Sequence, residues 1–144
     1  MTVEDALKKA RKYGAKTIDD VISDYQIMDH YLDLGTDLCG VFNKIGSCKQ
    51  IGINTRLSPR KQEFVKAHEV GHAMMHSHIK QLHCTKYSIF SSDKMEFEAN
   101  KFAVLFLWKQ NDYYSLNHFA QYHELELSIV KDMFGGRLGK TRVL

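Results

Sequence analysis

The chain has 144 residues, of which 44% are hydrophobic and 26% are charged, and its formal net charge is +3. No stretch approaches the roughly 18 apolar residues that span a membrane, and the charged start of the chain has no apolar run like that of a secretion signal. These properties predict one domain covering residues 1–144, with no membrane segment and a cytoplasmic location.

The first part of the chain predicts two short helices and a sheet. Thr2 and Asp5 have capping-box spacing, so a helix is expected over 2–13, with Gly14 placed to end it. A second short helix is expected over 18–25. Strands are expected at 30–34, 38–43 and 49–54, and a Gly46-Ser47 turn predicts that the last two form a hairpin. An exposed hairpin edge can bind a substrate as an added strand.

The three cysteines, Cys39, Cys48 and Cys84, are widely spaced and include no C-x-x-C pair. An odd number of cysteines argues against a disulfide framework. We therefore expect free thiols and a reducing compartment.

The next predicted helix carries the most informative motif of the chain, His68-Glu69-Val70-Gly71-His72. Ser58 followed by Pro59 is a favoured helix opening, and no further proline occurs before residue 78. Gly71 is unfavourable inside a helix by about 1 kcal/mol relative to alanine. We interpret it as a position where another segment comes close to the helix.

On a helix, this motif brings together the parts needed for metal-assisted hydrolysis. Residues four apart lie on one face, so the imidazoles of His68 and His72 can reach one ion. Glu69 projects roughly 100° away, where it can act as the base towards a water molecule. The pattern H-E-x-x-H on a helix is a signature of zinc proteases.

A third ligand is expected from a second helix that begins near Met95 and ends near residue 108 or 109. Glu96 and Asn100 border its apolar stripe, whereas Glu98 shares a side with two lysines, as in a solvated charge cluster. A carboxylate beside the core needs a partner, so Glu96 is the expected third ligand and Glu98 the fallback. Asn100, one turn further, is placed to hydrogen-bond a ligating histidine. The alternative for Glu96 is an acid that favours a helix N-terminus.

The remaining histidines are weaker candidates. His76 lies about 12 Å along the helix axis from His68, too far for both to bind one zinc ion. It is expected at the surface or behind a ligand. His78, His83 and Tyr87 fall in a connecting segment, where a hydrogen-bond donor could stabilise an oxyanion, although the sequence favours none of them.

Two further helices are expected at 116–123 and 127–134, followed by Gly135-Gly136. Their length allows a DNA-binding helix-turn-helix, and basic residues follow the second helix. The modest net charge and the acids Glu124, Glu126 and Asp132 oppose phosphate binding. Substrate docking or packing is therefore preferred, and no direct contact with nucleic acid is expected.

Over residues 58–107 the chain resembles the ImmA/IrrE family of zinc metallopeptidases. The resemblance rests on H-E-x-G-H at 68–72, followed by E-x-E-A-N-x-F-A at 96–103. It maps the third zinc ligand of zincins onto Glu96, with Asn100 four residues later. It also implies intracellular, site-specific proteolysis, typically of a repressor encoded by a phage or another mobile element.

The combined prediction is an α+β, zincin-like minimal metallopeptidase domain with a small antiparallel sheet packed on the HExxH helix. Its core covers 17–110 and its helical C-terminal segment covers 115–136. His68, His72 and Glu96 would bind Zn²⁺, and Glu69 would be the catalytic base. The expected partner is a protein substrate, a transcriptional repressor. The alternative is a non-catalytic zinc-binding regulator that relieves repression by binding the repressor.

Overall fold

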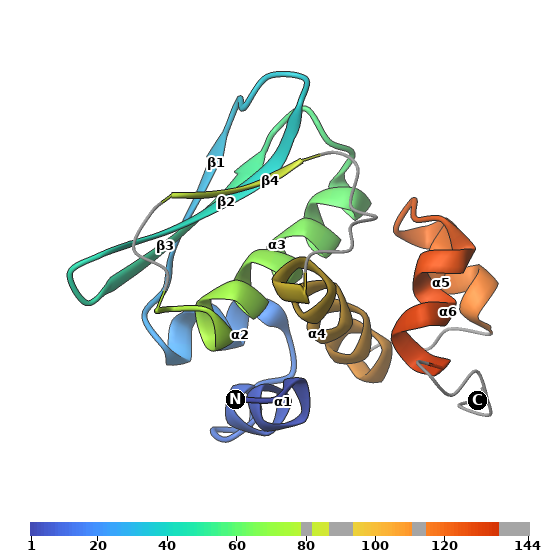
Figure 1. The fold of residues 1–144 in the computed structure, drawn as a ribbon, viewed down its shortest axis with the longest axis horizontal. Coiled ribbons are helices and arrows are strands. Elements are labelled where there is room, and N and C mark those ends of the chain that lie inside the picture. The colour runs from blue at the N-terminus through green and yellow to red at the C-terminus, as the bar shows by residue number, and fades with distance from the viewer. Residues whose placement is uncertain (79–81, 87–93, 111–114, 136–144) are drawn as a thin grey trace.

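The computed structural model describes residues 1–78, 82–86, 94–110 and 115–135. Within these ranges the chain forms helices and one sheet, as Figure 1 shows. The helices are α1 (Val3–Ala10), α2 (Ile18–Asp24), α3 (Pro59–Met75), α4 (Lys94–Gln110), α5 (Leu116–Tyr122) and α6 (Leu127–Gly135). The strands are β1 (Met28–Leu32), β2 (Leu38–Ile45), β3 (Cys48–Asn54) and β4 (His83–Lys86). The predicted α+β fold class is confirmed.

The sheet has the strand order β1-β3-β2-β4. The predicted hairpin is present, with β2 and β3 antiparallel and Gly46 at φ 63° in the turn. One detail of the prediction is wrong, because β1 and β3 are parallel. Strand β3 lies between β1 and β2 and is parallel to β1 but antiparallel to β2. The sheet is therefore mixed rather than antiparallel.

The hairpin therefore occupies the middle of the sheet, and the expectation of an exposed hairpin edge is wrong. Among the described strands, the edges are β1 and β4. Strand β4 was not predicted, because four residues are too few for a reliable alternating pattern. It pairs antiparallel with β2, which places Thr85 beside Gly40 and Cys84 beside Val41.

Helix α3 lies between the sheet and α4, as Figure 1 shows. Every residue from Ala67 to Met74 is buried, so the motif helix is covered on nearly all sides. Helices α1 and α2 also contact α3, and α6 packs against α4. This central position explains how polar side chains of α3 come to lie inside the protein.

Local sequence signals account for the helix starts. Thr2 and Asp5 form the predicted capping box, and Ser58 Oγ accepts a hydrogen bond from the backbone N–H of Lys61. The close approach predicted at Gly71 is confirmed, since a Cβ built there would lie 3.1 Å from Phe102 of α4.

The C-terminal helices pack on the rest of the domain. The carboxylate of Glu124, between α5 and α6, accepts a hydrogen bond from the hydroxyl of Ser58, and its backbone carbonyl accepts one from Lys61 Nζ at 3.0 Å. These contacts fit the preferred packing role. Most of the basic residues considered for DNA binding follow α6, outside the described residues. No helix within the described ranges is long and apolar enough to cross a membrane.

Candidate metal centre

The turn of α3 that carries the motif brings His68 and His72 together inside the protein. Their side chains are 1% and 0% exposed, and their ring centroids are 4.8 Å apart. Helix α4 crosses beside them and contributes Glu96, whose side chain is 13% exposed. One potential ligand atom from each of these three residues lies within 4.8 Å of the others. The structure thus gathers the three residues that the sequence proposed as metal ligands.

His68 is held from both sides of its ring. Its Nδ1–H donates to Asn100 Oδ1 at 2.7 Å, and its Nε2 lies 2.9 Å from Glu96 Oε1. Burial alone would lower the pKa of His68, but the neighbouring carboxylates of Glu96 and Glu69 raise it above its ordinary value. Asn100 therefore lies where the helical spacing placed it, one turn beyond Glu96.

His72 faces the same carboxylate without a hydrogen bond to it. Its Nε2 lies 3.1 Å from Glu96 Oε2, yet this nitrogen has no hydrogen-bond partner among the described residues. Burial lowers the pKa of His72 to about 4, so the imidazole is neutral near pH 7. Burial opposes ionisation of Glu96, but the three surrounding imidazoles hold its pKa below the ordinary value.

Glu69 lies on the sheet side of α3 and is fully buried. Neither of its carboxylate oxygens has a hydrogen-bond partner among the described residues. Burial raises the pKa of Glu69 to about 7. Room for this carboxylate exists because β2 has Gly40 there, where an added Cβ would lie only 2.8 Å from Glu69 Oε2.

Glu98 does not occupy the solvated charge cluster expected from its lysine neighbours, and that prediction is wrong. Its Oε1 accepts a hydrogen bond from His76 Nε2 at 2.9 Å, and its side chain is 24% exposed. His76 is 4% exposed, and its Nδ1 lies 2.9 Å from Nδ1 of His72. Of the two places considered for His76, the structure excludes the surface and puts the residue directly behind His72.

Sequence reasoning named His83 among three possible oxyanion donors but gave no reason to prefer it. It lies on β4, its Nε2 contacts Glu96 Oε2, and its ring centroid is 4.5 Å from that of His72. Thr85, two residues further along the strand, has its hydroxyl 3.4 Å from His68 Nε2. Only the pairing of β4 with β2 brings these side chains to the cluster, so no local signal identified them.

The donor set fits a metal ion. In the tautomer of His72 with its proton on Nδ1, Nε2 and Glu96 Oε2 face each other at 3.1 Å as two acceptors, which is unfavourable without a cation. Two histidines and one carboxylate are also a ligand set found in catalytic zinc sites. The unsatisfied Nε2 of His72 therefore agrees with metal binding at this position.

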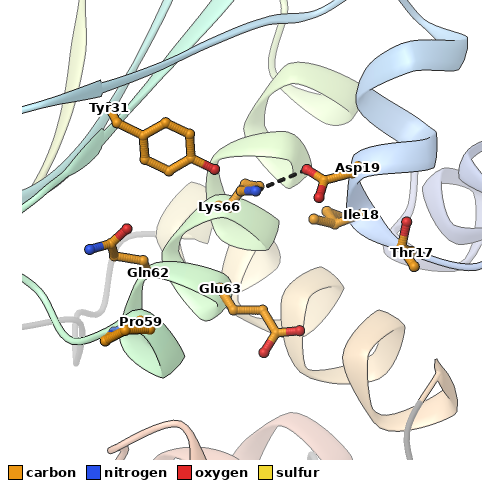
Figure 2. Close-up of a pocket in the computed structure, with 8 residues that line it drawn as sticks. All are labelled: Thr17, Ile18, Asp19, Tyr31, Pro59, Gln62, Glu63 and Lys66. Carbon is orange, nitrogen blue, oxygen red and sulfur yellow. Dashed lines mark hydrogen bonds and ion pairs between the residues drawn. The ribbon is translucent and has the colours of Figure 1, made fainter.

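A second feature lies on another side of α3, outside this cluster. A cavity of about 290 Å³ is lined by residues of α2, β1 and the first turns of α3. Figure 2 shows the side chains that line it. Lys66 Nζ lies 2.9 Å from Asp19 Oδ1 at its edge and 5.2 Å from the centroid of the Tyr31 ring. The cavity contains none of the clustered histidines or acids, so it is separate from the candidate metal centre.

Comparison with known proteins agrees with this geometry. Residues 17–133 match the model of the M78 peptidase family, described as the IrrE N-terminal-like domain. The chain belongs to this family. The matched region contains the whole cluster and the helices that build it, which indicates a metallopeptidase and agrees with a zincin-like fold.

A curated relative is the "Uncharacterized immunity region protein 2" of Bacillus phage phi105. It is 36% identical to this chain over 72 residues, which are 50% of this chain and 46% of the relative. The match thus spans about half of each protein, and it relates the chain to a phage protein.

Proposed function

We propose that the protein is a zinc-dependent, site-specific endopeptidase that cleaves a protein substrate, a transcriptional repressor of a phage or mobile element. One observation carries the proposal: a buried, unpaired carboxylate lies next to two histidines and a glutamate that converge on one point. Such a carboxylate is costly to bury, and general-base chemistry gives it a use.

In this proposal His68, His72 and Glu96 hold Zn²⁺, with Asn100 orienting His68. A bound zinc ion supplies Lewis acidity, which polarises the scissile carbonyl and makes water more acidic. The residues themselves fix the ligand atoms, because α3 and α4 are packed against each other and every ligand is mostly buried.

Glu69 performs the proton transfers in this scheme. Its carboxylate accepts a proton from the attacking water and then donates it to the nitrogen of the leaving amine. The burial that raises its pKa to about 7 suits both steps, because a group titrating near the working pH can accept and release a proton.

Strand β4 is the proposed place for the substrate backbone. It borders the cluster through His83 and Thr85, and no described strand pairs with its outer side. An extended segment of a substrate could add there by backbone hydrogen bonds. His83 would then be close enough to donate to the carbonyl oxygen under attack.

Support for a repressor as substrate comes from relatives. The motifs resemble a family whose members typically cut repressors, and the phage relative is named an immunity region protein. We therefore propose a repressor encoded in the same genetic element as the first substrate to test.

The test compares wild type with Glu69→Gln, which removes the base and leaves the proposed ligands intact. Zinc content is measured on both purified proteins, and each is incubated with the repressor while fragments are followed by mass spectrometry. Retained zinc with lost cleavage supports the proposal. A Glu69→Gln protein that still relieves repression in cells would contradict catalysis and favour the non-catalytic regulator, and wild type that binds no zinc would refute both.

A further inference from the structure

We propose that Glu98 and His76 are positioning residues that hold His72 in the tautomer with a free Nε2 lone pair directed at the metal. This inference rests on the proposed function, because it concerns a ligand of the same centre. It assigns a role to the second glutamate of α4, which the charge pattern had placed in solvent.

The assignment follows from which atoms can donate. A carboxylate only accepts hydrogen bonds, so the contact between Glu98 Oε1 and His76 Nε2 requires a proton on that nitrogen. A neutral imidazole has one N–H, so His76 Nδ1 is then an acceptor. It lies 2.9 Å from His72 Nδ1, which must donate. The proton of His72 is therefore on Nδ1. Its bare Nε2 lies 3.1 Å from Glu96 Oε2, but this contact is not a hydrogen bond and so does not require a proton on Nε2.

If the hydrogen bond between His76 and His72 ran in the opposite direction, His72 could not bind the metal ion. If His76 donated from Nδ1 to His72, a neutral His72 would carry its proton on Nε2, facing Glu96. A protonated nitrogen cannot bind a metal ion. Glu98 therefore acts at a distance of two hydrogen bonds by keeping the proton of His72 away from the metal.

Backbone geometry keeps the three groups in line. His76 caps the C-terminal end of α3, and its backbone N–H donates to the carbonyl of His72 at 2.7 Å. Glu98 lies in the first turns of α4, two residues after Glu96. The same stretch of α4 thus supplies the expected ligand Glu96 and, through His76, the support for His72.

The two ligating histidines are supported by different chemistry. Asn100 receives the Nδ1–H of His68 on its amide oxygen, but an amide also has N–H donors and could serve either tautomer after a flip. A carboxylate has no such freedom. The tautomer of His72 depends, through His76, on the Glu98 carboxylate, which can only accept hydrogen bonds. This tautomer should therefore be sensitive to replacement of Glu98.

The decisive variant is Glu98→Gln, which keeps the shape and a hydrogen bond to His76 but can donate as well as accept. Long-range ¹H–¹⁵N NMR of the metal-free protein at about pH 8, above the ordinary range of histidine titration, reports the tautomer of each ring. We expect one tautomer of His72 in wild type, protonated at Nδ1, and a mixture in Glu98→Gln. Glu98→Ala should shift the mixture further.

Zinc affinity provides the second measurement, with Zn²⁺ alone as the probe in competition with a chromophoric chelator. Loss of such a supporting hydrogen bond typically costs about 10–100-fold in metal affinity, and we expect this for both Glu98 variants. Glu63→Ala is the matched control, because it removes a partly buried acid from α3 away from the cluster. It should keep the affinity and tautomer of wild type.

The two proposals fail in different ways. Wild-type affinity together with a single Nδ1–H tautomer of His72 in Glu98→Gln would overturn the positioning role while leaving the zinc site intact. Failure of wild type itself to bind zinc would instead refute the proposed function. Because Glu98→Gln preserves packing, a loss of affinity without any tautomer change would also contradict the inference and indicate a structural effect.

Discussion

Replacing Gly40 with alanine should displace Glu69, the proposed base, while leaving the proposed metal ligands in place. A Cβ at this position would lie 2.8 Å from Glu69 Oε2, 2.8 Å from Val65 Cγ1 and 3.0 Å from the carbonyl oxygen of Gly52. The first two atoms belong to α3 and the third to β3. The new methyl group would therefore clash with both α3 and β3, and rotating one side chain cannot relieve all three contacts.

The size of the effect follows from these distances. Ordinary contacts begin at 3.4 Å, so the Glu69 carboxylate and Val65 must each recede by about 0.6 Å or β2 must shift. Overpacking of this kind costs about 1–3 kcal/mol of unfolding free energy. A misplacement approaching 1 Å can lower a catalysed rate by about 100-fold, so we expect a 10- to 100-fold loss in kcat/KM.

The assay compares Gly40→Ala with Gly52→Ala. A Cβ at Gly52 would lie 2.8 Å from Val41 Cγ2 and 3.4 Å from Leu32, so this variant strains the same sheet without touching Glu69. Urea denaturation, zinc affinity and repressor cleavage are measured for both. Both should lose stability and keep zinc, but only Gly40→Ala should lose most of its activity. Equal activity losses, or full activity in Gly40→Ala, would refute the reasoning.

The remaining predictions concern the third ligand, a buried histidine and a helix cap. Glu96→Ala should reduce zinc affinity in chelator competition more than Glu98→Ala does, because it removes the proposed third ligand rather than a residue proposed to position one. His123 is fully buried and burial lowers its pKa to about 4, so stability present above pH 6.5 should be lost as pH falls towards 4. Between these values the unfolding free energy of wild type should fall by up to about 3 kcal/mol more than that of His123→Asn. Ser58→Ala should lower the urea midpoint by an amount equivalent to about 1 kcal/mol, because the N-cap is lost.

Each of these predictions has a clear contrary result. Equal or greater affinity loss in Glu98→Ala would mean that the ligand was chosen from the wrong side of α4. Parallel stability curves for wild type and His123→Asn would show that this histidine is protonated equally in the folded and unfolded states. An unchanged urea midpoint in Ser58→Ala would show that the cap contributes nothing measurable.

Sequence reasoning worked where the signal is local or periodic. The caps at Thr2 and Ser58 gave helix starts that agree with the structure, because a capping side chain bonds to backbone only a few residues away. The apolar stripe of α4 placed Glu96 beside the two histidines, because residues four apart share a helix face, although the same argument wrongly placed Glu98 in solvent. The glycine at 71 indicated close packing, and Phe102 provides it.

The misses are all pairings between distant segments. Strand β4 exists because β2 offers it an edge, and four residues alone contain too little pattern to predict this. The parallel pairing of β1 with β3 depends on which strand of the hairpin lies beside β1. The contact of Glu98 with His76 depends on how α3 and α4 cross. Helical spacing could place each of these two residues on a face, but it could not identify the partner opposite that face.

Two glycines show how the chain favours the site over local stability. Gly71 weakens the interior of α3 by about 1 kcal/mol relative to alanine, yet it leaves room for Phe102 of α4, the helix that also carries Glu96. Gly40 weakens a central strand, yet it admits the carboxylate of Glu69. A domain built only for stability would fill both gaps and remove the unpaired acid. Departures from local preference are expected at functional sites, and here both lie at the proposed ligands and base.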